Sequence, residues 1–448
     1  MSALGYLSQR SLLSGFVIFF LIMGPFSITA MNKINVLILF VFSSCTLFLS
    51  FLIGKKIRFW RISSIPSSLY ISSFIISLFA ILLTRDSLTG EFVSSVIFGR
   101  LFTFLTVVFI VILVNMWLSQ VALSELQRAL KIAFGVALFF VLLGHWQFIG
   151  NLVGIPFFIE TRDWMHGVPS AIRSVVPRRL TSIAEEPNFL SPLLIEYIIL
   201  ASLVIAGKKT KLIAYGLGIF VIIFSFSGGV YINALLLVTC FGFLSLYRSL
   251  VSGRLKGQDL VFLFLVLLGL SILLSIGDIL LDFLYYKFQG EAAGQSARSQ
   301  FLSSLAMLIS QSKAMELTFG HGMATMSVLT DFGLAKEEFL FRITNNFYLD
   351  MIWEGGFLGL TCVLLFFGYL LFIGFRHYLD NKYFEAGLLL TIHMMITCLY
   401  RSEYLSSHFL WVVTLIFICY KLGSMADSNN RVQRSNLDTP ISNLKVHS

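Results

Sequence analysis

The chain of 448 residues is 57% hydrophobic and 12% charged, about half the charged fraction of a typical soluble protein. This composition excludes a soluble globular protein and indicates a polytopic membrane protein. The net charge of +9 is better explained as a topology signal than by nucleic-acid binding. The five cysteines all fall in apolar runs, and none is paired at metal-ligand spacing. Neither a disulfide framework nor a zinc site is therefore expected.

Runs of about 20 apolar residues predict membrane spans along the chain. The first run follows Arg10 and is long enough to span, so we interpret it as an uncleaved anchor. The sequence predicts an all-α membrane protein with about 12 transmembrane helices, which form a single helical domain over residues 1–424. The predicted spans cover approximately residues 12–30, 34–53, 66–84, 98–118, 130–150, 188–206, 210–225, 229–247, 258–276, 346–375, 383–400 and 405–424.

The orientation of the spans follows from Lys and Arg in the short loops, because long loops obey the charge rule poorly. In the short loops these residues concentrate on the side of the N-terminus, so both termini are predicted to be cytoplasmic. Two long segments, about 151–187 and 277–345, are then periplasmic, and loops of such length are usually functional or disordered. The polar tail over residues 425–448 shows no period and is predicted to be a disordered cytoplasmic segment.

A dense charged run precedes the sixth span. Arg178, Arg179, Glu185 and Glu186 lie within nine residues, and Pro187 suits the first turn of the helix that follows. Charges at membrane depth are costly and usually functional. The alternative is an arginine pair that meets lipid headgroups at the membrane edge, with the glutamates as helix N-terminal charges. The residue types alone leave both interpretations open.

An acidic face marks the outer end of the tenth span. Asn346, Asp350 and Glu354 recur every four residues and therefore share one face of a helix. Such a face is expected to line water or another polar group rather than lipid. The alternative is a solvated helix end.

Other polar residues have simpler interpretations. Glu196, two turns into the sixth span, is interpreted as a hydrogen-bonded carboxyl between helices. His145 and His393 lie on apolar runs and are expected to be satisfied core residues rather than ligands. Arg401 and Glu403 can pair in a short outer loop, an interaction of low value at a surface.

The chain contains no Asp-x-Asp, clustered histidines, P-loop or Gly-x-Ser-x-Gly, so no metal and no cofactor is expected. The remaining candidates for chemistry are arginines and carboxylates on the outer face. Guanidinium groups bind phosphate bidentately, and a carboxylate can activate a hydroxyl. Together they suit a metal-independent transfer from a lipid diphosphate to an alcohol, in which the arginines stabilise the departing diphosphate. Arg100 opens the fourth span and either snorkels to the interface or meets a phosphate.

Three motifs follow one another over residues 170–360. They are Arg179-x-x-Ser182-x-x-x-Glu186-Pro187-Asn188, then Arg298 followed by Gly320-x-Gly322, then Asn345-Asn346-x-Tyr348-Leu349 with Glu354-Gly355 and Gly359. In order, spacing and topology this region resembles the bacterial O-antigen polymerase and O-antigen ligase superfamily of membrane glycosyltransferases. The spans before it match that superfamily only in hydrophobicity.

The resemblance implies a substrate carried on undecaprenyl diphosphate at the periplasmic face of the bacterial inner membrane. The donor is the growing glycan and the acceptor is a lipid-linked repeat unit. By this resemblance Arg179 and Arg298 hold the diphosphates, and Glu186 or Glu354 is the base. Further substrate contacts are expected from Arg178, Asn188, Asn345, Asn346, Asp350 and Arg100. The expected partners are lipid-linked oligosaccharides and membrane lipids, with a chain-length regulator protein as a further candidate and no nucleic acid.

One departure from the family pattern favours a polymerase. Ligases usually carry a histidine where this chain has Asn345. A second departure is Gly228, which replaces the arginine of a Ser-Arg-Gly turn and puts that side chain's role in doubt. An O-antigen ligase is the first alternative, and a lipid-linked oligosaccharide flippase or transporter is the second. The concentration of polar residues outside does not suit a transporter built from two repeated halves.

Overall fold

The computed structural model describes residues 8–53, 58–83, 90, 97–155, 179–225, 227–253, 305–326, 344, 346–379, 381–402 and 405–437. This part of the chain is almost entirely helical, and its only β-type contact is an isolated antiparallel bridge between Thr29 and Ala184. The prediction of an all-α polytopic membrane protein is therefore confirmed at the level of fold class.

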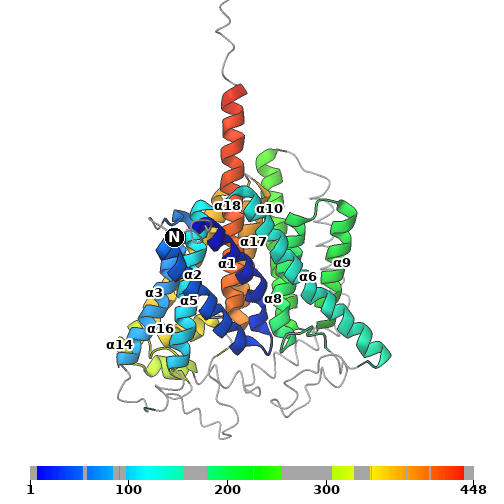
Figure 1. Cartoon of the computed structure of the whole chain (residues 1–448). Coiled ribbons are helices and arrows are strands. Elements are labelled where there is room, and N and C mark those ends of the chain that lie inside the picture. Colours follow the sequence, from blue (N-terminus) through cyan, green and yellow to red (C-terminus); the bar gives the residue numbers. More distant parts are fainter. Residues whose placement is uncertain are drawn as a thin grey trace, which may run out of the picture.

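The helices follow one another up and down through the bundle (Figure 1). The first half comprises α1 (Gln9–Met23), the 3-10 helix η2 (Gly24–Ile28), α2 (Asn32–Ile53), α3 (Arg61–Ala80), η3 (Ile81–Leu83), α5 (Phe98–Gln120) and α6 (Leu123–Val153). The second half comprises α8 (Pro187–Val204), α9 (Lys208–Ser225), α10 (Gly228–Ser252), α14 (Ala314–Phe319), α16 (Phe347–His377), α17 (Lys382–Tyr400) and α18 (Ser407–Leu437).

Polar caps fix where several of these helices begin. The Ser8 hydroxyl accepts a hydrogen bond from Ser11 N at the start of α1. Asn346 and Asn381 cap α16 and α17 in the same way. Pro187 occupies the first turn of α8, where its missing N–H leaves no bond unmade. The chain therefore reverses at polar points between apolar runs.

Ten helical segments in the described part of the chain are long and apolar enough to cross a membrane. They correspond to ten of the twelve predicted spans. The predicted span at 210–225 is present as α9, but three lysines in its first turn keep it out of these ten. The predicted span at 258–276 lies outside the described residues. The expected number of twelve thus stays a prediction.

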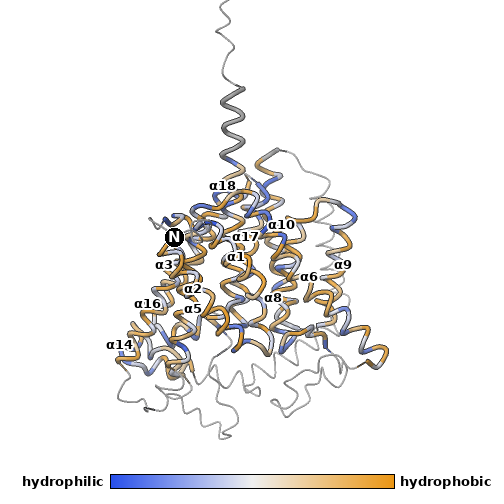
Figure 2. The backbone as a smooth tube through the Cα atoms, viewed as in Figure 1, coloured by the Kyte–Doolittle hydropathy of each residue, from blue (hydrophilic) through white to orange (hydrophobic). Residues whose placement is uncertain are grey.

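The core of the bundle surrounds α18, in which every residue from Ser407 to Tyr420 is buried. α18 packs on α17, α17 packs on α16, and α16 packs along α3. On the other side α8 packs against α6, α9 and α17. Hydrophobic residues dominate the lengths of the helices (Figure 2), as a membrane interior requires.

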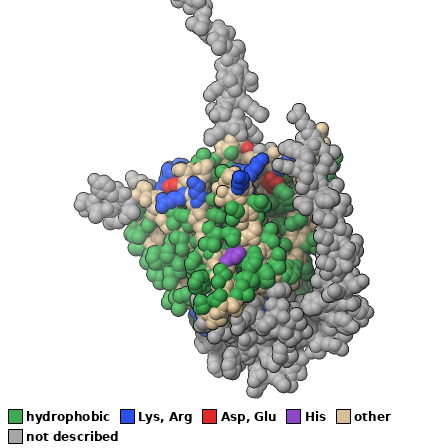
Figure 3. All heavy atoms as spheres, turned by 90° about the vertical axis from the view of Figure 1, so that its right-hand side faces the viewer, with side chains coloured by type: hydrophobic (Ala, Val, Ile, Leu, Met, Phe, Trp, Pro, Cys, Tyr) green, Lys and Arg blue, Asp and Glu red, His purple; other side chains and the backbone are tan. Residues whose placement is uncertain are grey.

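The two ends of the bundle differ in charge. The start of α1 and the far end of α18 lie at one end, whereas α14 lies at the other (Figure 1). On the face drawn in Figure 3, Lys and Arg gather near the end from which α18 emerges, and apolar side chains cover the middle. Two ion pairs lie at this basic end, Arg10 with Glu125 at 2.8 Å and Arg248 with Glu385 at 2.9 Å.

One boundary differs from the prediction. The last span was expected to end at residue 424 and to be followed by a disordered tail. Instead, α18 continues to Leu437 and projects beyond the bundle (Figure 1). A helix can continue into a polar segment because helical hydrogen bonding does not require an apolar sequence once the helix is nucleated. Residues 438–448 lie outside the described residues.

Candidate functional site

The charged run before α8, residues 179–186, is a turn hydrogen-bonded to neighbouring helices, and we call it the docked turn. Leu180 N donates to Phe224 O at the end of α9, at 3.0 Å. The amide oxygen of Gln147, on α6, accepts from both Thr181 N at 2.9 Å and Ser182 N at 2.8 Å. Ser182 has φ +52°, a conformation that non-glycine residues rarely adopt. These bonds fix the backbone of residues 180–182 against two helices.

The charged residues of this turn lie beside the end of α9 and the start of α8. Arg179 Nε donates to Ser225 O at 3.2 Å, which ties this arginine to the end of α9. Glu185 N donates to Ile28 O in η2 at 3.0 Å. The side chains of Glu185 and Glu186 are partly exposed, and Glu186 has extended backbone immediately before the helix. Both carboxylates therefore lie at the N-terminal end of α8.

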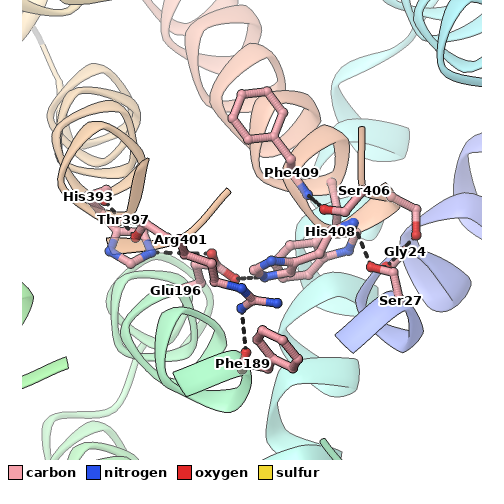
Figure 4. A network of polar contacts seen from close by, with 12 residues as sticks. Gly24, Ser27, Phe189, Glu196, His393, Thr397, Arg401, Ser406, His408 and Phe409 are labelled. Carbon is pink, nitrogen blue, oxygen red and sulfur yellow. Dashed lines mark hydrogen bonds and ion pairs between the residues drawn. The ribbon is translucent and has the colours of Figure 1, made fainter. Parts of the chain in front are cut away.

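Deeper along α8, Glu196 lies between two histidines from different helices (Figure 4). Its Oε1 is 3.3 Å from Nε2 of His393 on α17, and its Oε2 is 2.9 Å from Nε2 of His408 on α18. The three side chains are at most 2% exposed. Asn233 Oδ1, on α10, is 3.1 Å from the other ring nitrogen of His393. The interpretation of Glu196 as an interhelical carboxyl and of His393 as a satisfied core residue is confirmed.

Arg401 joins this cluster to the docked turn. It is 6% exposed, and its Nη1 donates to Phe189 O at 2.9 Å in the first turn of α8. The guanidinium carbon also lies 4.2 Å from the centroid of the Phe189 ring. Burial lowers the pKa of Arg401 to about 9, and the charges of Glu196, Glu186 and Glu185 act in the opposite direction. The guanidinium is therefore positively charged at neutral pH.

The burial of Arg401 corrects the expectation that this arginine lies at a surface, whereas its pairing with Glu403 stays a prediction. Arg401 is buried and reaches a main-chain carbonyl more than 200 positions earlier in the sequence. Glu403 itself lies outside the described residues. A buried arginine with main-chain and aromatic partners is held in one orientation, unlike an arginine in an exposed pair.

The acidic face of α16 is turned into protein. Asp350 Oδ1 accepts from Thr344 N at 2.7 Å, and the charge of Arg100 acts on its carboxylate. Asn346 caps the helix by accepting from Leu349 N, and its Nδ2 donates to Leu399 O at the end of α17. The expectation that this face meets polar groups rather than lipid is confirmed.

Glu354 binds a loop of the main chain. Its Oε1 accepts from Ala324 N at 2.9 Å. Two residues further on, Gly356 has φ +61°, and α16 is kinked there. The kink frees the carbonyl groups of residues 353 and 354, which accept from His321 N at 2.7 Å and Gly322 N at 3.0 Å. We call this set of contacts between residues 320–324 and residues 353–356 the loop seam.

The Gly-His-Gly turn requires its glycines at the loop seam. Gly320 and Gly322 have φ +85° and +101°. A Cβ on Gly320 would come within 2.4 Å of the Glu354 carbonyl, a distance that real Cβ atoms do not show. The ring of His321 stacks on the indole of Trp353 at 4.1 Å, and burial lowers the pKa of this histidine. His321 is therefore a neutral imidazole at physiological pH.

Seven of the ten predicted site residues are described, and all seven lie at the end opposite the basic one: Arg100, Arg179, Glu186, Asn188, Asn346, Asp350 and Glu354. The other three, Arg178, Arg298 and Asn345, lie outside the described residues. Asn188 Oδ1 accepts from the Ser227 hydroxyl at 2.7 Å, which links α8 to the start of α10. Asp350 and Glu354 are each 1% exposed, so both carboxylates are enclosed.

Sequence reasoning did not identify Asn233 and His408 as members of this region, and it gave Arg401 the wrong surroundings. The available signal was a polar side chain within or beside an apolar run, which marks an intramembrane contact but not its partner. Within the described ranges, no group of three or more His, Cys, Asp and Glu side chains is placed to hold a metal ion.

Neither a protein-family model nor a curated protein matches this chain. The proposed function therefore rests on the resemblance of the motifs and on the arrangement of the residues.

Proposed function

We propose that this chain is a metal-independent membrane glycosyltransferase of the polysaccharide-polymerase type. It transfers a growing glycan from undecaprenyl diphosphate to a lipid-linked repeat unit. The reaction takes place at the periplasmic face of the bacterial inner membrane, because the candidate site lies opposite the end where Lys and Arg gather.

The proposal is carried by the grouping of guanidinium and carboxylate side chains around the first turn of α8. Arg179 is tied to the end of α9, and Arg401 arrives from the end of α17. Glu185 and Glu186 lie close enough to Arg401 to act on its charge. Guanidinium groups suit a diphosphate, and a nearby carboxylate suits an attacking hydroxyl. Residues from distant parts of the sequence thus supply both the cations for a leaving diphosphate and the carboxylate for an attacking hydroxyl.

Glu186 is the better of the two candidate bases. Glu354 is 1% exposed and uses one carboxylate oxygen to bind Ala324 N in the loop seam. Glu186 is partly exposed and lies beside the charges of the docked turn. A base has to reach the proton that it removes, so the enclosed Glu354 is better explained as an anchor for the loop.

The reaction then balances without a further reagent. The acceptor hydroxyl gives its proton to Glu186 while its oxygen forms a bond to the anomeric carbon of the donor glycan. The bond between that carbon and the phosphate oxygen breaks, and undecaprenyl diphosphate leaves with the electron pair. Arg179 and Arg401 stabilise the charge that develops on the leaving diphosphate. By the family resemblance Arg298, with Arg178 and Asn345, contributes further contacts to the same substrates.

The remaining described residues position the site. Asn188 holds the first turn of α8 to the start of α10 through Ser227. Asn346 fixes the outer end of α16 beside the end of α17, which carries Arg401, and Asp350 holds the backbone of Thr344 at the same end. Arg100 acts on Asp350 from α5 and helps to fix that end of the bundle. These residues fix the ends of the helices that carry the candidate site.

A deletion strain tests the proposal. Loss of a polymerase leaves single repeat units attached to the surface core lipid. Loss of a ligase leaves long chains on undecaprenyl diphosphate together with bare core, and loss of a flippase traps single units inside, also with bare core. We expect the first pattern on a gel of surface glycolipid, read with an inventory of lipid-linked intermediates. Bare core with accumulated long lipid-linked chains would refute the polymerase.

A transporter or flippase is the second candidate function, and one observation favours it. Glu196, His393 and His408 form a buried ionisable cluster contributed by three membrane-crossing helices. Ionisable residues of this kind line proton and substrate pathways in many transporters. The same glycan inventory separates the two functions, because a flippase leaves its substrate on the inner side of the membrane.

A further inference from the structure

The cluster of Glu196, His393 and His408 is not used by the proposed transfer. The three side chains come from α8, α17 and α18, and they are enclosed within the bundle (Figure 4). Each histidine presents Nε2 to a different oxygen of the same carboxylate. The hydrogen bonds around His393 determine where the protons lie.

The first step concerns the orientation of the Asn233 side-chain amide. The Thr397 hydroxyl donates its single proton to His393 O at 2.9 Å. Its oxygen, 3.0 Å from Asn233, must then accept, so Nδ2 of Asn233 faces Thr397. The same Nδ2 is 3.1 Å from the hydroxyl of Tyr400. The reverse orientation of the amide would bring two oxygens together at Thr397 without a proton between them.

The second step concerns Nδ1 of His393. Because Asn233 directs Nδ2 to Thr397, its Oδ1 faces Nδ1 of His393 at 3.1 Å. An amide oxygen can only accept, so Nδ1 of His393 must carry a proton. The ring is thereby fixed with one proton on the side away from Glu196.

The third step concerns the contact between His393 and Glu196. Nε2 of His393 and Oε1 of Glu196 are 3.3 Å apart, and one proton is needed between them. The Glu196 carboxylate also meets Nε2 of His408 at 2.9 Å and feels the positive charge of Arg401. A nearby cation favours the ionised carboxylate. The proton therefore resides on His393, which then has protons on both ring nitrogens.

We infer that Glu196, His393 and His408 form a proton-binding site inside the membrane-spanning bundle. The ligand is a single proton, held on Nε2 of His393 against the Glu196 carboxylate. The ionisable groups that face the site are Glu196 from α8, His408 from α18, and Tyr400 and Arg401 from the end of α17. Asn233 from α10 is neutral and fixes the ring. The inference is independent of the proposed glycosyl transfer.

The proton site links more helices than a buried ion pair between two side chains does. The proton is bound at a junction of α8, α10, α17 and α18, so its release changes the hydrogen bonds among four helices at once. Glutamate and histidine groups in this setting act as proton relays in membrane proteins. Because the carboxylate and the imidazole interact closely, the bound proton belongs to the pair rather than to one residue.

Nitrogen NMR of the full chain in lipid nanodiscs tests the inference. The sample is a variant that keeps only His393 and His408 of the seven histidines, labelled with ¹⁵N in the imidazole rings. We expect the ring of His393 to carry protons on both nitrogens, the Nδ1 proton facing Asn233 and the Nε2 proton facing Glu196. Further replacement of His393 by Gln should remove the signal of this doubly protonated ring, whereas His408→Gln should leave it.

Two outcomes would overturn the inference. One is that both rings carry a single proton, since Nε2 of His393 then holds no proton beside its Nδ1–H. The other is that the imidazolium signal survives His393→Gln. Glu196→Gln provides a second measurement, because an amide does not hold the proton and the ring should become neutral. If a substituted chain does not fold, the two-histidine sample alone still shows whether an imidazolium is present. A deletion strain that refutes the polymerase would leave these spectra unchanged.

Discussion

Glu196 and Glu354 are both 1% exposed within membrane-crossing helices, yet they meet different partners. Glu196 meets the imidazole rings of two histidines. Glu354 meets the main-chain N–H of Ala324. The interactions of a carboxylate that faces imidazole rings depend on the protonation of those rings. A carboxylate that accepts from a main-chain N–H instead fixes the position of that backbone segment. The partner therefore distinguishes a charge cluster from a structural anchor, although burial is the same in both.

The largest effect is expected for Glu196→Gln. The substitution removes the carboxylate that faces both imidazole rings, and removing one partner of a buried charge cluster costs about 3–5 kcal/mol. The measurement is the free energy of unfolding of the purified protein in detergent micelles. A loss below about 1 kcal/mol, the value of an exposed pair, would show that the cluster carries no buried charge.

Gly320→Ala tests the loop seam, which packs against the main chain of Glu354. The added Cβ meets the Glu354 carbonyl, and φ +85° is unfavourable for alanine. Left-handed strain and overpacking together should cost about 2–4 kcal/mol. Gly154→Ala is the matched control, because Gly154 has φ +74° but no atom within 4 Å of its added Cβ. Equal losses in the midpoint of thermal unfolding would show that the loop seam adds no steric constraint.

Glu354 should tolerate glutamine but not alanine. The glutamine oxygen can still accept from Ala324 N, whereas Glu354→Ala leaves that buried N–H without its acceptor and costs about 1–3 kcal/mol. Thermal unfolding of both variants in detergent provides the measurement. The reverse ranking, with Glu354→Gln as harmful as Glu354→Ala, would indicate that the carboxylate charge itself is needed. In that case Glu354 would resemble Glu196.

Arginine-to-lysine changes test charge against shape at the candidate site. Arg179→Lys and Arg298→Lys should each reduce polymerisation at least about tenfold, because an ammonium group cannot replace the planar guanidinium on a diphosphate. Lys382→Arg at the basic end serves as the control and should leave activity unchanged. The assay is the length distribution of glycan chains made by cells with equal amounts of inserted protein. Normal polymers from both lysine variants would assign these arginines to topology.

The smallest effect is expected at the basic end. Arg10 is exposed and pairs with Glu125 at 2.8 Å. Exposed pairs contribute about 0–1 kcal/mol, so Arg10→Gln should shift the free energy of unfolding by no more than that. This variant sets the baseline against which the loss from Glu196→Gln is judged. A loss comparable to that of Glu196→Gln would mean that burial does not separate the two pairs.

Much of the fold follows from local composition. Apolar runs identify ten segments that are present as membrane-length helices, because the sequence needs only length and hydrophobicity to specify a span. The four-residue spacing of Asn346, Asp350 and Glu354 also identified a face that meets protein, since the helical period is a local property. The far end of α18 was not anticipated, because a polar sequence without a period does not reveal a continuing helix.

The partners within the site could not be read in the same way. His408 and Glu196 are 212 positions apart, and so are Arg401 and Phe189. A single sequence shows that these side chains need polar partners but not which helix supplies them. The sequence marks Gly320 and Gly322 as part of a motif, whereas their role in accommodating the Glu354 main chain depends on a kink in a distant helix. Contacts of this kind arise from packing rather than from local pattern.

The loop seam has a consequence for the order in which the protein is assembled during synthesis. Residue 323 donates its N–H to Ser77 O at the end of α3, and residue 322 donates to Glu354 O in α16. α3 leaves the ribosome early, the loop much later, and α16 last of these three. The loop therefore cannot be enclosed until α16 has entered the membrane and come to rest against α3. Closure of this seam is a late step of biogenesis, and a defect there would expose an otherwise complete bundle to quality-control proteases.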